Sequence, residues 1–271
     1  MMPTEMRNPK TMHLDKEDTL TMLKLINEEN MNSVRAVDAA LPQIEKAVEA
    51  VTAAIKEGGR LIYIGAGTSG RLAVVDAAEC PPTFGVDYNT VIAVIAGGEK
   101  ALVRASENAE DQTEAGRRDL LAREVTVKDV VMGISAAGNA AYVVSALNAA
   151  KEIGCVTVSL SSNPESKIGA IADIPIFVDS GPEVVTGSTR MKAGNTQKMV
   201  LNMISTCAMV KTGKVYENLM INLKPTNEKL RKRVIGIVSQ ICEVDEDTAL
   251  QLLEDNNFVI RDALKAFGKD V

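Results

Sequence analysis

Residues 61–70 read LIYIGAGTSG, and this stretch decides the fold. Its first four residues are continuously apolar, as is typical of a strand covered on both faces of a parallel sheet. Residues 65–70 then have the glycine spacing of a tight turn that leads from a strand into a helix. We therefore expect a strand, a glycine-rich loop and a helix in direct succession.

Four similar apolar runs follow, separated by Gly-rich turns and helical stretches. The five runs predict a doubly wound α/β fold, with a mostly parallel five-stranded sheet flanked by helices. Pro175 lies inside the last run, and it favours an edge strand because proline cannot donate a ladder hydrogen bond. The four runs are VIAVI (91–95), VVMGI (130–134), VTVSL (156–160) and IPIFV (174–178).

Helices are predicted before the sheet region. One helix is expected to start near Asp18, and Pro42 marks the break before a second helix, which Gly58-Gly59 ends. The second helix has an apolar face with spacings of four, three and four residues. That face consists of Ile44, Val48, Val51 and Ile55.

The C-terminal part is also predicted to be helical. A long helix is expected over about residues 188–212, and its methionines at 199, 203 and 209 favour core or dimer packing. The last forty or so residues predict a small helical appendage, with two short helices joined at Asn256-Asn257. The predicted domains are an N-terminal helical segment (1–52), a central sheet domain (53–216) and a C-terminal helical region (217–271).

Composition excludes several classes of protein. The net charge of −6 and the aromatic content of 3% argue against a nucleic-acid-binding protein. No apolar run reaches membrane-spanning length, so we expect a soluble, cytoplasmic protein without a membrane partner. His13 is the single histidine, and the four cysteines have no metal-finger spacing, so no metal site is expected. No cofactor is predicted either.

The loop after the first apolar run is the strongest candidate ligand site. Gly67, Thr68 and Ser69 combine backbone N–H groups at a helix N-terminus with two hydroxyls, which suits a phosphate monoester. A dinucleotide is less favoured, because Glu99 follows the second run only beyond two glycines; a tight turn that binds nothing is the other alternative. A second strand-to-helix loop carries Ser135, Gly138 and Asn139.

Three long motifs resemble the N-acetylmuramic acid 6-phosphate etherases, a family built on the sugar isomerase (SIS) domain and related to the glucokinase regulatory proteins. They are GAGTSGRLAVVDAAECPPTFG (65–85), IAGGEKALVRASENAED (95–111) and GPEVVTGSTRMKAGNTQK (181–198). The resemblance implies a metal-independent homodimer, with active sites near the subunit interface. It implies cleavage of the D-lactyl ether of the phosphorylated sugar, which gives N-acetylglucosamine 6-phosphate and D-lactate in cell-wall recycling.

The same resemblance assigns site residues. Glu79 matches the acid that protonates the departing lactyl oxygen, and Glu110 matches the base at C2. Two carboxylates in different environments suffice for such an elimination. The resemblance also implies that four residues lie at or near the sugar phosphate: Glu183, Ser188, Thr189 and Lys192.

One loop departs from the family pattern. Ala137 and Ala140 stand where related proteins carry hydroxyls, so Ser135 or backbone N–H groups would have to hold the phosphate. This departure keeps a non-catalytic sugar-phosphate regulator open as an alternative. An aldose–ketose isomerase and a SIS-type transcription regulator are further alternatives, and the second is disfavoured because the N-terminal segment has no basic recognition helix.

Overall fold

A computed structural model describes residues 2–223, 225 and 227–270. Its centre is a five-stranded sheet in which every pair of neighbouring strands is parallel, in the order β2-β1-β3-β4-β5. Each predicted strand is confirmed to within one residue, and Pro175 lies on an edge strand as expected. The strands are β1 (Leu61–Gly65), β2 (Val91–Ile95), β3 (Val130–Ile134), β4 (Val156–Ser161) and β5 (Ile174–Phe177).

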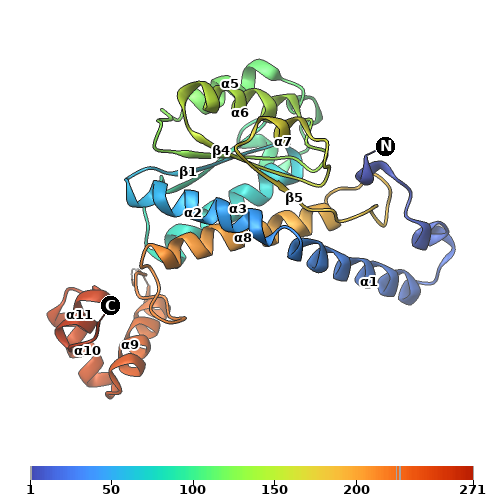
Figure 1. Cartoon of the computed structure of the whole chain (residues 1–271). Helices are drawn as coiled ribbons and strands as arrows, with labels where there is room; N and C mark the ends of the chain where they lie inside the picture. Colours follow the sequence, from blue (N-terminus) through green and yellow to red (C-terminus); the bar gives the residue numbers. More distant parts are fainter. Residues whose placement is uncertain (1, 224, 226, 271) are drawn as a thin grey trace.

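Helices cover both faces of the sheet (Figure 1). On one face pack α2 (Leu41–Lys56), α3 (Gly67–Phe84) and α8 (Lys192–Lys211). On the other face pack α5 (Thr113–Leu121), α6 (Ala141–Ile153) and α7 (Lys167–Ile171). Alternate residues of β1 serve the two cores, with Tyr63 in the first and Ile64 in the second. A short helix α4 (Lys100–Val103) follows β2. The predicted doubly wound fold is therefore confirmed.

The N-terminal helix α1 (Thr19–Asp38) extends beyond the sheet as an arm (Figure 1). Asp18 accepts hydrogen bonds from the backbone N–H groups of Leu20 and Thr21, which confirms the predicted helix start. Ahead of α1, three short turns cover Pro3–Glu5, Pro9–Thr11 and Leu14–Lys16.

The C-terminal helices form a small unit with a hydrophobic core of its own. This unit lies apart from the sheet (Figure 1), and its second and third helices are separated at the predicted Asn256-Asn257. The boundary at 216/217 stays a prediction. The three helices are α9 (Glu228–Cys242), α10 (Glu246–Asp255) and α11 (Ile260–Ala266).

The expected start of the long helix near Ser188 is wrong by one turn. α8 begins at Lys192, because the buried carboxylate of Glu183 accepts hydrogen bonds from the backbone N–H groups of Lys192 (2.9 Å) and Ala193 (2.9 Å). An acidic group in this position satisfies helix-terminal donors and favours the positive end of the helix dipole. Of the α8 methionines, Met209 is fully buried in the core.

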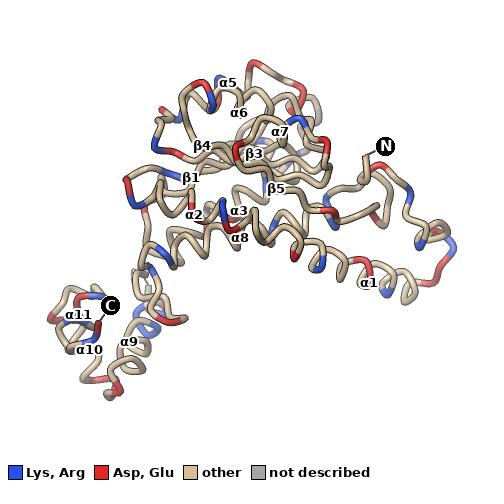
Figure 2. The backbone as a smooth tube through the Cα atoms, in the orientation of Figure 1, with Lys and Arg blue, Asp and Glu red and all other residues tan. Residues whose placement is uncertain are grey.

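Charged residues lie outside the sheet. The strands carry none, and Lys and Arg are interspersed with Asp and Glu along the outer helices and loops (Figure 2). Within the described residues, no helix is both long enough and apolar enough to span a membrane.

Candidate active site

The predicted loops meet at the carboxyl edge of the sheet. β1 pairs with β2 on one side and with β3 on the other, so the chain reverses its winding direction between β1 and β3. In open α/β sheets this switch point is where the crevice for a ligand forms. Gly65 of β1 stands beside Ile134 of β3, so the loops that follow these strands are neighbours.

The β1–α3 loop presents backbone donors at the start of α3. No side chain among the described residues caps this helix end. Gly67 has φ +54°, and Ser69 is buried at the first turn. Gly70 has to be a glycine, because a Cβ there would lie 2.6 Å from Cγ1 of Ile95. The loop therefore combines orphan N–H groups with the hydroxyls of Thr68 and Ser69, as an anion site requires.

The β3–α6 loop is held by its own hydrogen bonds. The Ser135 hydroxyl accepts a bond from the backbone N–H of Gly138 (3.1 Å), which leaves the hydroxyl proton available for donation. Gly138 has φ +74°, and a side chain there would overlap Ser166. Asn139 Oδ1 accepts from the backbone N–H of Lys167 (3.3 Å). This loop thus supplies Ser135 and backbone groups even though Ala137 has no hydroxyl.

Glu183 and Lys192 are buried and engaged within the protein. Lys192 Nζ lies 2.5 Å from Glu29 Oε2 of α1, and both side chains are less than 5% exposed. Asn8 Nδ2 adds a hydrogen bond of 2.8 Å to the same carboxylate oxygen. These contacts tie the N-terminal segment and α1 to the start of α8. Sequence reasoning missed Glu29 because it lies 163 residues from Lys192 and no local pattern marks it.

The pKa values of the two buried carboxyl groups, Glu183 and Glu29, are shifted in opposite directions. Burial raises the pKa of Glu183 against the opposing hydrogen bonds from the backbone N–H groups of Ala193 and Lys192. Burial also acts to raise the pKa of Glu29, but hydrogen bonds from Lys192, Lys10 and Asn8 outweigh it and leave that pKa lowered. Glu29 is therefore the ionised partner of Lys192.

Ser188 and Thr189 lie in the turn that leads into α8. The Thr189 carbonyl accepts a hydrogen bond from the backbone N–H of Gly194 (2.9 Å). A Cβ placed on Gly194 would lie 3.6 Å from Cγ2 of Thr68. The turn is thus adjacent to the β1–α3 loop, where it can contribute hydroxyls to the same site.

Glu79 and Glu110 are both exposed, and one chain does not bring them together. Glu79 is on α3, about 18 Å along the helix from its start at the carboxyl edge, at 1.5 Å per residue. The Glu110 carbonyl accepts from the backbone N–H of Tyr142 (2.9 Å), at the start of α6 and therefore at the carboxyl edge. Glu79 thus lies toward the amino ends of the strands, whereas the backbone of Glu110 lies at their carboxyl ends.

A buried network fixes α3, and with it Glu79, against the rest of the domain. The Asp76 carboxylate accepts hydrogen bonds from Tyr63 Oη of β1 (2.9 Å) and Asn202 Nδ2 of α8 (2.6 Å). Ser205 of α8 adds a third bond of 3.1 Å. Movement of α3 that would carry Glu79 to the carboxyl edge would break all three.

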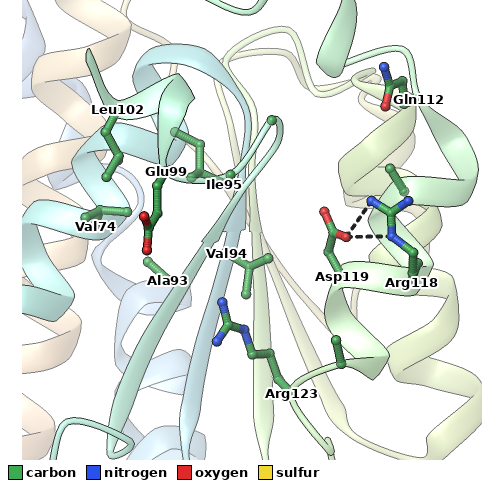
Figure 3. A pocket seen from close by; sticks show the side chains of 14 residues that line it. Val74, Ala93, Val94, Ile95, Glu99, Leu102, Gln112, Arg118, Asp119 and Arg123 are labelled. Atoms are coloured by element: carbon green, nitrogen blue, oxygen red, sulfur yellow. Dashed lines mark hydrogen bonds and ion pairs between the residues drawn. The ribbon is translucent and has the colours of Figure 1, made fainter. Parts of the chain in front are cut away.

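A large cavity of about 820 Å³ lies along the free edge of β2. Figure 3 shows Glu99 on one wall and the paired Arg118 and Asp119 on the opposite wall. Asp119 also accepts a hydrogen bond from Tyr142 Oη (2.9 Å). None of the predicted site residues lines this cavity, so its volume does not indicate the site.

The described residues contain no group of three or more His, Cys, Asp or Glu side chains placed to hold a metal ion. All four cysteines are free thiols, and Cys80, which lies next to Glu79, has its pKa raised to about 12 by burial and by the charge of Asp76. The thiol of Cys80 is therefore protonated at neutral pH.

Comparisons with known proteins agree with this architecture. Residues 43–151 match the family model described as glucokinase regulatory protein N-terminal SIS domain. A Halalkalibacterium halodurans protein named N-acetylmuramic acid 6-phosphate etherase is 51% identical over 96% of this chain and 88% of its own length. A Pasteurella multocida protein of the same name is 49% identical over 94% of this chain and 84% of its own length.

Solved structures share the fold. A putative phosphosugar isomerase involved in capsule formation from Bacteroides fragilis superimposes with a TM-score of 0.56 at 21% identity, over 73% of this chain and 94% of that chain. A phosphoheptose isomerase from Francisella tularensis superimposes with a TM-score of 0.53 at 15% identity, over 72% of this chain and 99% of that chain. At these identities the likeness supports the fold alone.

Proposed function

The chain belongs to the family of N-acetylmuramic acid 6-phosphate etherases, and we infer that it cleaves the D-lactyl ether of N-acetylmuramic acid 6-phosphate. The products are N-acetylglucosamine 6-phosphate and D-lactate, and the reaction belongs to peptidoglycan and amino-sugar recycling. The observation that carries this inference is the similarity over 96% of the chain to proteins of that name. A non-catalytic sugar-phosphate regulator is less favoured, since it would need no acid–base pair.

The 6-phosphate is proposed to bind at the switch point. Thr68 and Ser69 at the start of α3, the hydroxyl of Ser135 with the backbone N–H of Asn139, and the turn at Ser188 and Thr189 supply donors from three adjacent segments. Gly138 shapes the second of these segments. Glu183 and Lys192 are proposed to support the site without contacting the phosphate. Their buried contacts hold that turn and the start of α8 in place.

The chemistry is a β-elimination followed by hydration. In the open-chain sugar the C1 aldehyde acidifies the C2 hydrogen, and Glu110 takes that proton. The electron pair forms the C2=C3 double bond as the C3–O bond breaks, and Glu79 protonates the departing lactyl oxygen. Water then adds at C3 and a proton returns to C2.

Two subunits are needed to assemble this site. Because Glu79 and Glu110 lie toward opposite edges in one chain, the Glu79 of a second copy has to join the Glu110 of the first. α3 offers the surface for this, since Thr68, Leu72, Val75 and Glu79 recur at helical spacing and none is buried. Val75 in the middle is 57% exposed.

Antiparallel packing of α3 on the α3 of a second copy would bring the Glu79 of that copy to the carboxyl ends of the strands. In a twofold pair, residues on either side of the axis exchange places, so an axis between Leu72 and Val75 sets the partner's Glu79 against Thr68. Met199 and Met203 of α8 flank this surface as half-buried apolar residues. The proposed homodimer thus has two composite sites, each with Glu110 from one protomer and Glu79 from its partner.

The test is release of D-lactate from N-acetylmuramic acid 6-phosphate, together with exchange of the C2 hydrogen in deuterated water. We expect Glu110→Gln to abolish both exchange and release, because the base is missing. Glu79→Ala should keep the exchange and lose the release, because elimination lacks its acid. Release at the wild-type rate from either variant would contradict these roles, and no release from the wild type would contradict the function.

In water labelled with heavy oxygen, the label should appear in the amino sugar and not in D-lactate, because water adds at C3 after elimination. Label in the lactate would indicate a different bond cleavage.

A further inference from the structure

A groove of about 380 Å³ lies where α1, α3 and α8 meet, beside the candidate phosphate site. Thr68 belongs to both, because it lies at the start of α3 and also lines the groove. Arg190, in the turn before α8, and Lys198, on the second turn of α8, line the same groove. The groove is therefore continuous with the site and separate from the loop of β3.

The polar groups of this groove are mainly donors. Arg190 and Lys198 line it, and neither forms an ion pair within the described chain. Ser33 of α1 is 1% exposed, and its hydroxyl has no hydrogen-bond partner among the described residues. Asn30 Oδ1 is occupied by Asn195 Nδ2 (3.2 Å), which leaves the Asn30 amide donors available.

No acidic side chain is among the described residues that line the groove. Two cations and an amide therefore line a space that suits an anion. The remaining wall is apolar and consists of Val34, Leu72 and Met199.

We propose that this groove binds the lactyl group of the substrate, with Arg190 and Lys198 on its carboxylate and the apolar wall against its methyl group. The proposal rests on the proposed function, because only the etherase substrate carries this group. The lactyl ether has one carboxylate and one methyl group, which match the cationic half and the apolar half of the groove. Arg190 and Lys198 are thus binding residues that select an acidic ether over a neutral one.

This position of the lactyl group is consistent with Glu79 of the second protomer as the acid that protonates the C3 oxygen. The phosphate lies over the strand ends and the lactyl group over α3 and α8, so the C3 oxygen between them lies near Thr68. The antiparallel dimer brings the partner's Glu79 to the same residue. The carboxylate of the substrate offsets one of the two positive charges, which weakens their tendency to keep the partner's Glu79 ionised.

The experiment compares the natural substrate with an analogue whose lactyl carboxylate is converted to the neutral amide. We expect the wild type to prefer the acid by at least about 10-fold in kcat/KM, as for loss of a charge-assisted contact. The double variant Arg190→Met/Lys198→Met should lose this preference through a higher KM for the acid, with the amide unaffected. D-lactate, tested as a product inhibitor and by calorimetry, should bind at least about 10-fold more weakly to the variant.

The matched control is Lys229→Met/Arg233→Met, which removes two exposed cations from α9 and should keep the wild-type preference. Equal rates of the wild type on the acid and the amide would overturn the proposal, as would a double variant that keeps the preference. A wild type that cleaves the ether of neither compound, releasing neither lactate from the acid nor lactamide from the amide, would contradict the proposed function instead. Weaker D-lactate binding by the variant would then still support the anion groove.

Discussion

Lys192 is proposed to support the phosphate site through its contacts within the protein. The sequence predicts it at or near the sugar phosphate, and in the structure its ammonium group lies against Glu29 with both side chains buried. A buried ion pair contributes little net free energy, but removing one partner strands the other charge. The Glu29–Lys192 pair therefore connects α1 to the start of α8 and to the turn at Ser188 and Thr189.

Glu29→Gln is expected to lower the free energy of unfolding by about 3–5 kcal/mol, because Lys192 is left without its counter-charge. Denaturant titration at pH 7 measures this. Glu28→Gln, which changes an exposed neighbour on the same helix, is the control and should have little effect. An unchanged midpoint for Glu29→Gln would mean that the pair does not hold the segments together.

The pH dependence of this difference has a defined sign. The pKa of Glu29 lies below its ordinary value of 4.5 in the folded protein, so its stabilising contribution is present above that value and is lost as pH falls through the folded pKa. The stability gap between wild type and Glu29→Gln should therefore shrink on acidification from pH 7 toward the folded-state pKa. A gap that widens would contradict the assignment of Glu29 as the ionised partner.

At the scale of elements, the sequence predicts what local patterns determine. Continuous apolar runs specify strands buried on both faces, and Asp18, Pro42 and the glycine pair at 58–59 mark helix ends that the structure confirms. The start of α8 is predicted one turn early, because Ser188 and Thr189 have the chemistry of caps. Glu183 takes that role from nine residues away, and a contact made by a loop leaves no periodic signal.

Two glycines within helices, one tightly packed and one open, test the close packing of α5 against α6. A Cβ on Gly116 of α5 would overlap the Tyr142 carbonyl of α6, so Gly116→Ala should destabilise the protein by about 1–3 kcal/mol. Gly236 of α9 has no heavy atom within 4 Å of such a Cβ, so Gly236→Ala should stabilise by up to about 1 kcal/mol.

Thermal and denaturant unfolding followed by circular dichroism measure both effects. Because Tyr142 donates its N–H to the Glu110 carbonyl, Gly116→Ala should also slow lactate release, whereas Gly236→Ala should not. Equal effects of the two substitutions would contradict the close approach of α5 and α6.

For the whole molecule, the sequence identifies candidate residues but cannot place them. The loops after β1 and β3 are both recognisable as strand-to-helix turns, and sheet pairing brings them together. Glu79 and Glu110 are expected in one site, yet the direction of α3 carries Glu79 away from it. The family resemblance already implies a homodimer, but chain patterns do not rank surfaces, so the α3 surface is proposed as the interface only once the fold is known.

Val75→Asp is expected to convert the proposed dimer to a monomer and to abolish lactate release, since it places a charge at the centre of the α3 surface. Light scattering coupled to size-exclusion chromatography measures the mass. Val127→Asp is the matched control: this valine is 64% exposed, precedes β3 and lies outside the α3 surface. A dimeric, active Val75→Asp protein would place the interface elsewhere.

Complementation between two inactive variants tests the composite site most directly. Glu79→Ala and Glu110→Gln proteins are mixed under conditions that exchange subunits, and mass spectrometry verifies the mixed dimers. If each site takes Glu110 from one protomer and Glu79 from the other, about half of the dimers regain one site, and lactate release should recover to about a quarter of the wild-type rate. Mixed dimers that release no lactate would contradict the shared site.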